Sequence, residues 1–126
     1  EREAADVLRW MGSRTFAFGA GYNFTHLHFT ESLNHGYFSP GQYQSHLAEA
    51  GFRVRIGRVF RGEYLGLGGV ESFSGGMPNP AGEVHLRNHF LLGRWDLAVN
   101  YSRYQVAQST GAFQANSGTV SLGYLF

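Results

Sequence analysis

The sequence predicts an all-β fold built from antiparallel strands. Apolar and small polar residues alternate strictly at the C-terminal end, where the apolar positions are Val120, Leu122, Tyr124 and Phe126. A period of two residues is typical of a strand. The composition agrees, because 18 glycines, 11 phenylalanines and 7 tyrosines among 126 residues indicate many turns and aromatic rows rather than helices.

The C-terminal alternation also fits a strand that crosses a membrane, with the apolar row facing lipid and the polar row facing a lumen. With an aromatic residue at its very end, this tail resembles the last strand of a bacterial outer-membrane β-barrel. The resemblance implies an antiparallel transmembrane β-barrel in the lipid of the bacterial outer membrane. It also implies an assembly signal, read by the barrel-assembly machinery, made of Val120, Leu122, Tyr124 and Phe126.

The composition excludes several other classes of protein. Cysteine is absent, which excludes disulfide scaffolds and thiolate metal sites. A net charge of +1 with 15% charged residues provides no field for binding nucleic acid. No apolar run reaches the roughly 18 residues of a spanning helix, whereas membrane strands need only about 10 alternating residues. No secretory signal opens the chain, so we expect the C-terminal part of a longer, exported polypeptide.

Residues 1–12 predict a short helix, and residues 13–126 predict strands. In the first segment acidic residues come early, apolar residues follow, and Gly12 ends the pattern. The alternation then predicts six strands: about Arg14–Phe29, Tyr43–Ile56, Phe60–Ser72, Glu83–Leu92, Trp95–Val106 and Phe113 to the end. The phase of the first strand slips at His26 and His28, which indicates a bulge or a strand end beyond the bilayer.

Two short connections predict the register of the hairpins. Gly93-Arg94 is a two-residue turn with glycine first, which pairs Leu92 with Trp95. A three-residue loop over Gly57–Val59 keeps both faces in phase on either side of it. The resulting pairs are Ile56 with Phe60, Arg53 with Glu63, and Arg55 with Arg61. The last of these pairs is unfavourable and requires a nearby acid or water.

Loop lengths predict the two sides of the barrel. If the C-terminus lies at the periplasmic rim, both glycine turns and the N-terminal helix lie there too. The longer loops then face outside: Thr30–Gln42, Phe73–Ala81 and Ala107–Gly111. Four aromatic residues share the periplasmic interface: Phe16, Phe60, Trp95 and Phe126. Because single-chain barrels begin at eight strands, we expect either further strands in a longer protein or several copies that close one barrel.

The histidines suggest a metal site, but polar residues on a wet lumen or loop explain them better. His26 and His28 share one face of a strand, and so do His85 and His89. No Cys, Asp or Glu ligand is fixed by spacing around either pair. We therefore expect no metal and no other cofactor.

Two glutamates and a glycine cluster suggest glycoside hydrolysis and phosphate binding, but their positions in the sequence support neither. Glu63 and Glu71 do not form a glycosidase pair, because one lies beside arginine and the other near a loop. We expect no enzymatic activity. Gly66, Gly68 and Gly69 do not open a helix and therefore hold no phosphate. Strand flexibility or close packing of inner side chains explains these glycines better.

The most specific motif is the segment from Tyr37 to Tyr43. Its Tyr-Phe-Ser-Pro-x-x-Tyr core resembles a strand-opening segment, aromatic-Ser-Pro-x-x-Tyr, of the outer-membrane export porins for bacterial exopolysaccharides, of the cellulose synthase C subunit and poly-N-acetylglucosamine porin type. In that family tetratricopeptide helices lead into a barrel, which implies that residues 1–12 end the helical array. The motif residues are Tyr37, Phe38, Ser39, Pro40 and Tyr43. They either contact the polysaccharide or open a strand with interfacial aromatics.

Strand phase predicts a polar lumen wall that contacts the substrate. Its residues are Arg53, Arg55, Arg61, Glu63, His85, Arg87, His89, Asp96 and Asn100. Such a wall suits a hydrated glycan that must not be held tightly, and its positive bias also suits an anionic or acetylated polymer. The resemblance implies an outer-membrane pore that exports an exopolysaccharide such as cellulose, with the polysaccharide chain and an inner-membrane glycosyltransferase complex as partners. Two alternatives remain: another outer-membrane barrel, such as an adhesin or small-solute porin, and a soluble all-β carbohydrate-binding or structural domain.

Overall fold

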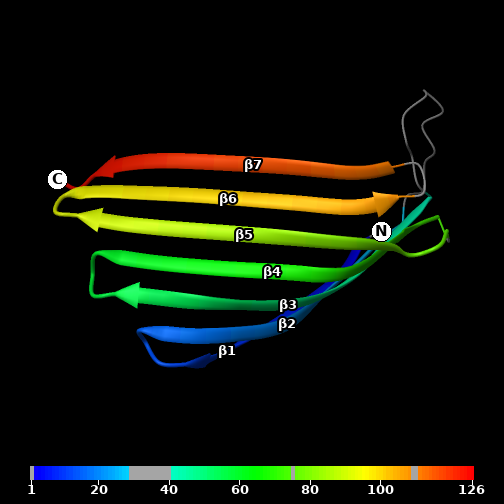
Figure 1. Ribbon diagram of the computed structural model, residues 1–126, viewed down its shortest axis with the longest axis horizontal. Coiled ribbons are helices and arrows are strands. Elements are labelled where there is room, and N and C mark those ends of the chain that lie inside the picture. The colour runs from blue at the N-terminus through cyan, green and yellow to red at the C-terminus, as the bar shows by residue number, and fades with distance from the viewer. Residues whose placement is uncertain (1, 29–40, 75, 109–110) are drawn as a thin grey trace.

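The computed structural model describes residues 2–28, 41–74, 76–108 and 111–126, and all of its regular structure is β. Seven strands form one antiparallel sheet in which each strand pairs with its neighbours in sequence (Figure 1). They are β1 Arg2–Gly12, β2 Phe16–His28, β3 Gln42–Ile56, β4 Phe60–Phe73, β5 Asn79–Leu92, β6 Trp95–Gln108 and β7 Gly111–Tyr124. The all-β, antiparallel prediction is therefore confirmed.

The predicted helix over residues 1–12 is wrong. β1 pairs with β2 without interruption from Arg2 opposite Leu27 to Gly12 opposite Ala17. A helix of this length is marginal by itself, whereas pairing with β2 satisfies its backbone groups along one edge. Gly12, with a φ of +136°, ends the strand and leads into the hairpin turn instead of capping a helix. The chain therefore has one strand more than predicted, and its N-terminus lies at the opposite end of the sheet from its C-terminus (Figure 1).

The register predicted from the two glycine turns is confirmed. Leu92 lies opposite Trp95, and Ile56 lies opposite Phe60. Gly57 and Gly93 have φ values of +56° and +66°, the left-handed conformation that favours glycine in a tight hairpin. Both turns and the C-terminus lie at one end of the sheet, called the turn end, and the opposite end is called the loop end (Figure 1).

The predicted bulge near His26 and His28 does not occur. β2 stays in register with β3 from Phe16 opposite Val54 to His28 opposite Gln42. The change from apolar to polar residues on this face therefore marks a change of environment along a regular strand. In this polar part of the face, His26 forms a hydrogen bond, since its Nε2 lies 2.8 Å from the side-chain nitrogen of Gln42.

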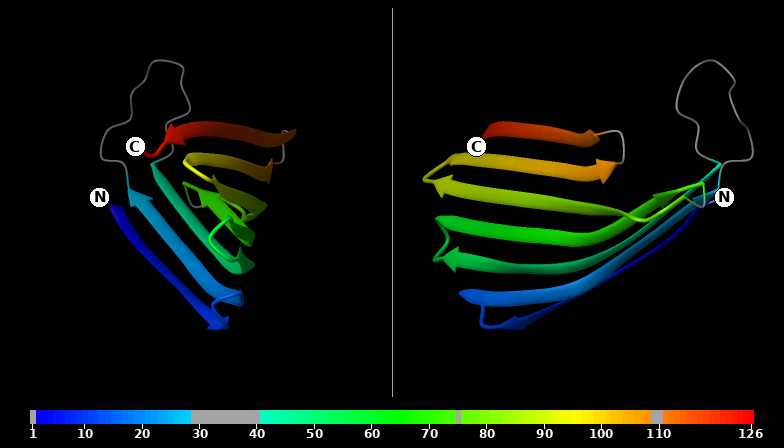
Figure 2. Two further views of the ribbon diagram at one scale, coloured as in Figure 1. Left: turned by 90° about the vertical axis from the view of Figure 1, so that its left-hand side faces the viewer. Right: turned by 45° about the vertical axis from the view of Figure 1, so that its right-hand side comes forward.

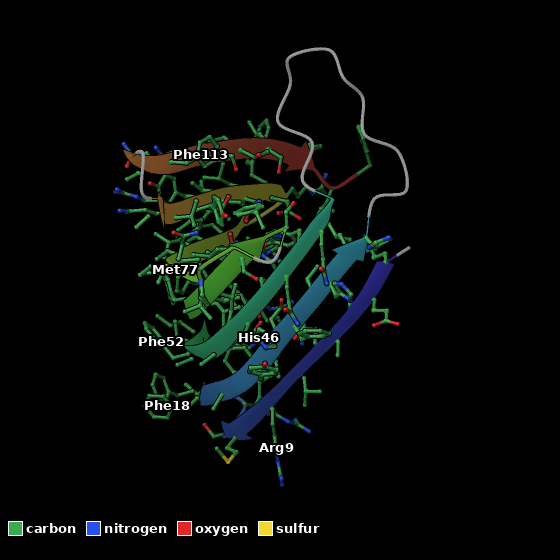
Figure 3. All side chains as sticks on the ribbon, turned by 90° about the vertical axis from the view of Figure 1, so that its right-hand side faces the viewer. Arg9, Phe18, His46, Phe52, Met77 and Phe113 are labelled. Atoms are coloured by element: carbon green, nitrogen blue, oxygen red, sulfur yellow. The ribbon has the colours of Figure 1, made fainter. Side chains whose placement is uncertain are left out.

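The sheet has two chemically different faces, which alternate along every strand. The apolar face carries Phe18, Phe52, Phe90, Leu97 and Leu122, which the register aligns on one side. Figure 3 shows Phe18 and Phe52 projecting from the same side of β2 and β3. The opposite side, which carries the charged residues of β3, β4 and β5, is called the polar face. No second layer covers the apolar face in the described part of the chain.

The sheet is curved and twisted, so that β1 to β3 run obliquely to β5 to β7 (Figure 2). The buried side chains belong to the polar face, which places that face on the inside of the curve. Leu47, Ala81 and Val106 form a small apolar cluster there, with Leu67 and Tyr104 packed against it. This cluster explains why Leu67 interrupts a polar row of β4 in the sequence.

Candidate functional site

A continuous row of charged side chains crosses the polar face near the turn end. Nε of Arg53 in β3 donates to Oε2 of Glu63 in β4 at 2.6 Å. Nη1 of Arg87 in β5 donates to the other oxygen, Oε1, at 3.1 Å. Asn100 of β6 lies next in register beyond Arg87. One carboxylate thus holds two guanidinium groups, and together they present hydrogen-bond donors in fixed positions.

An aromatic ring from β1 extends this row to the edge of the sheet. The guanidinium carbon of Arg53 lies 3.8 Å from the ring centroid of Trp10, a cation–π contact. The indole lies flat against Gly19 of β2, where a Cβ atom would approach the ring to 2.9 Å. Glycine is therefore required at position 19 to let the ring lie on the sheet. The row thus joins an indole held between Gly19 and Arg53 to the charged hydrogen-bond donors of β3 and β5.

The next row toward the turn end contains a pair of arginines without a counter-charge. Arg55 and Arg61 lie directly opposite one another on β3 and β4. Among the described residues, neither forms an ion pair with a carboxylate. The neighbouring His89 is instead paired with Asp96 of β6. Like charges directly opposite in a sheet are destabilising, so this pair is costly to the fold as it stands.

A hollow adjoins the two arginines on the polar face. Its volume is about 430 Å³, and its lining includes Trp10, Arg14, Arg53, Arg55 and Arg61. Arg55 and Arg61 also line a second hollow of about 270 Å³, together with His89 and Arg58. The turn end of the polar face is therefore the place where open space and positive charge coincide.

The loop end of the polar face carries a buried carboxylate instead. Glu71 of β4 is only 1% exposed. The hydroxyl of Tyr43 in β3 donates to its Oε1 at 2.8 Å, and the hydroxyl of Tyr104 in β6 donates to its Oε2. Tyr104 reaches across β5 to make this contact, which requires the curvature of the sheet. The three side chains therefore tie β3, β4 and β6 together.

Removing one hydroxyl from this network should destabilise the fold. We expect Tyr104→Phe to lower the free energy of unfolding by about 1–3 kcal/mol, because a buried carboxylate loses one of its two donors. Tyr101→Phe on the same strand is the matched control, since the Tyr101 hydroxyl bonds Asn116 on the exposed apolar face. Urea unfolding followed by tyrosine and tryptophan fluorescence measures both. If both variants lose the same free energy of unfolding, the Tyr104–Glu71 hydrogen bond stabilises the fold no more than an exposed hydrogen bond does.

The two histidine pairs singled out in the sequence lie on opposite faces of the sheet. His26 and His28 are on the apolar face at the loop end, whereas His85 and His89 are on the polar face. Nε2 of His85 lies 2.9 Å from Oε2 of Glu83, its neighbour along the same face. Among residues 2–28, 41–74, 76–108 and 111–126, no group of three or more His, Asp or Glu side chains could hold a metal ion.

The residues predicted to line a lumen all lie on the polar face. They are Arg53, Arg55, Arg61, Glu63, His85, Arg87, His89, Asp96 and Asn100. Most of them fall within the two charged rows at the turn end, and His85 lies one row closer to the loop end. The structure brings Arg53, Glu63 and Arg87 into contact and leaves Arg55 and Arg61 facing each other.

Most of the predicted aromatic-Ser-Pro motif lies outside the described residues, namely Tyr37, Phe38, Ser39 and Pro40. Its last residue, Tyr43, belongs to the Glu71 network on the polar face. The predicted assembly-signal residues Val120, Leu122 and Tyr124 lie on the apolar face of β7. Phe126 follows the strand and places its ring 5.5 Å from that of Tyr124.

Trp10, Tyr104 and the buried position of Glu71 were not predicted from the sequence. Trp10 was missed because residues 1–12 predict a helix, and because apolar residues fall on both faces of β1, with Leu8 and Trp10 on one and Val7 and Met11 on the other. Glu71 was interpreted as a residue near a loop. Its partners come from strands distant in sequence, so no local pattern identifies them.

Comparison with known proteins finds no matching family model, no similar curated protein and no similar solved structure. Within the part of the chain that the structure describes, no helix is long and apolar enough to cross a membrane.

Proposed function

We propose that this chain forms part of the wall of a bacterial outer-membrane β-barrel whose lumen exports an exopolysaccharide. The observation that carries the proposal is the uncovered apolar face. Val120 and Leu122 are 70% and 65% exposed, and large aromatic and aliphatic side chains cover the same face on every neighbouring strand. Such a continuous apolar surface on a soluble monomer is unusual, whereas lipid covers it favourably.

The length of the apolar surface supports a membrane. On β3 it runs over nine residues, from Ile56 to Ala48, before His46 begins the polar loop end. A tilted membrane-spanning strand needs about 9–11 residues. At the turn end the apolar surface is edged by aromatic rings, including Trp95 and Tyr124, whose centroids are 5.0 Å apart. Aromatic residues are enriched at membrane interfaces.

The unpaired edges of the sheet support closure by further strands. Within the described residues, β1 pairs with β2 alone and β7 with β6 alone. In lipid each exposed backbone group would cost free energy, so both edges must be paired, either by other strands of a longer protein or by other copies. Two observations support a saccharide as the exported substrate. The segment from Tyr37 to Tyr43 resembles that of the export porins, and the row from Arg53 to Arg87 offers a glycan charged hydrogen-bond donors beside the edge of the Trp10 ring.

The proposal predicts that the protein requires detergent or lipid and forms a pore. We expect it to sediment with outer membranes, to resist extraction by urea, and to dissolve only in detergent. Reconstituted into planar bilayers with its native assembly partners, it should conduct ions, and an oligosaccharide of the exported polymer should reduce that conductance.

A monodisperse folded monomer purified without detergent would contradict the membrane part of this proposal and favour a soluble all-β domain. If the protein requires detergent but no oligosaccharide changes its conductance, the barrel part of the proposal stands and polysaccharide export is contradicted. A small-solute porin or an adhesin would then describe the protein better.

A further inference from the structure

Arg55 and Arg61 have the properties of a binding site for an anion. They face each other on neighbouring strands, and no carboxylate among the described residues pairs with either. Both side chains are exposed on the polar face and line the hollow of about 430 Å³. Two arginines that line the same open space favour an oxyanion there, because each guanidinium presents a planar fork of donors.

The row beside this pair shows how the same sheet neutralises arginines elsewhere. Arg53 and Arg87 are two strands apart, and Glu63 lies between them with one oxygen for each. The row of Arg55 and Arg61 continues to His89, and Asp96 pairs with that histidine rather than with either arginine. Among the described residues, a carboxylate therefore neutralises Arg53 and Arg87 but neither Arg55 nor Arg61.

The residues around Arg55 and Arg61 indicate which kind of molecule bears the anionic group. Trp10 lines the same hollow, and because Gly19 and Arg53 cover the two faces of its ring, it offers the apolar edge of the indole to the C–H groups of a sugar. Arg14 adds a third cation at the hairpin turn between β1 and β2. Trp10 and the three arginines of β3 and β4 that line the hollow belong to the polar face, although Met11 and Val54 of the apolar face also contribute to its lining. The charged side of the hollow therefore lies away from the apolar surface assigned to lipid, which favours a saccharide over a lipid headgroup.

We propose that Arg55 and Arg61 bind the carboxylate of an acidic sugar unit in the hollow beside Trp10. This inference rests on the proposed export function and narrows the polymer to one with uronate-type units. Arg53 is held by Glu63 and by the Trp10 ring, so it shapes the hollow without supplying its charge to the ligand.

The test measures binding of trigalacturonic acid to the full chain in detergent by isothermal titration calorimetry. We expect saturable binding to the wild type and no binding of the neutral cellotriose. Arg55→Gln and Arg61→Gln should each raise the dissociation constant about tenfold, which corresponds to one lost charge-assisted hydrogen-bonding group. Arg94→Gln is the matched control, because it removes the same charge at the turn end from a residue outside both hollows. The dissociation constant of Arg94→Gln should stay within about twofold of the wild-type value.

Thermal unfolding separates binding from folding. Without ligand, Arg55→Gln should unfold at the same temperature as the wild type or higher, since it relieves the pair of like charges. At one ligand concentration, trigalacturonic acid should raise the unfolding temperature of the wild type more than that of the variant. No binding to the wild type, or an equal loss in Arg94→Gln, would overturn the proposal. Arginine-dependent binding to phosphatidylglycerol vesicles with none to trigalacturonic acid would also overturn it in favour of a lipid. None of these results depends on pore formation.

Discussion

Leu97→Arg is expected to prevent most of the protein from assembling in the membrane, whereas Ala98→Arg on the neighbouring position is expected to assemble. Leu97 lies on the apolar face between Phe90 and Leu122, and Ala98 lies on the polar face between His89 and Ser121. A charge directed at lipid costs about 2–4 kcal/mol near the midplane and less toward the interfaces. Since Leu97 is one pleat from Trp95 at the edge of the apolar surface, we expect about 2 kcal/mol.

The two variants carry the same new charge at nearly the same depth, so they differ only in the face that receives it. Heat-modifiable mobility of outer-membrane fractions, with equal expression, measures the folded proportion. A soluble sheet would behave in the opposite way, because an arginine on its exposed apolar face would improve solubility. Equal folded yields for Leu97→Arg and Ala98→Arg would therefore contradict the assignment of the apolar face to lipid.

Strand phase and turn geometry were sufficient to predict most of the sheet. The parity argument at Gly57–Val59 gave the correct pairing of Arg53 with Glu63 and of Arg55 with Arg61, because a one-residue slip would invert both faces. It also identified the arginine pair as one that needs a nearby acid or water. The structure places no acid against either arginine among the described residues, and this observation carries the anion-site proposal.

The N-terminal strand was not predictable from its own residues. The two faces of β1 are mixed, with Arg9 among the apolar residues and Leu8 and Trp10 among the polar ones. Its pairing with β2 is a non-local interaction that outweighs weak local propensity. Once β1 is placed, the mixed pattern has a physical explanation, because Trp10 is needed on the polar face to pack on Gly19 and beneath Arg53.

The curvature of the sheet could not be predicted from the sequence pattern either. Alternation assigns each residue to a face, but it does not reveal which face lies inside the curve or which residues meet across it. Glu71 and Tyr104 are on strands that are not neighbours, and they meet only because the sheet coils. The polar face thus contains a buried network at the loop end and an open charged surface at the turn end.

Gly69→Ala is expected to destabilise the sheet strongly, whereas Gly68→Ala is expected to leave it unchanged or slightly more stable. Gly69 lies opposite Leu47 on the polar face, and a Cβ atom there would clash with the backbone oxygen of His46. Because backbone cannot move aside as a side chain can, β3 and β4 must separate or untwist to admit the methyl group. A Cβ on Gly68, which points to the other face, meets nothing within 4 Å.

We expect Gly69→Ala to lose about 1–3 kcal/mol, the usual cost of overpacking. Gly68→Ala should gain a few tenths to about 1 kcal/mol, since alanine restricts the unfolded chain more than glycine does. The urea midpoint of refolded protein in detergent, monitored by heat-modifiable mobility, measures both. Identical midpoints would show that β3 and β4 can separate freely beside Leu47. The close approach of the two strands there would then have no part in curving the polar face around the Glu71 network.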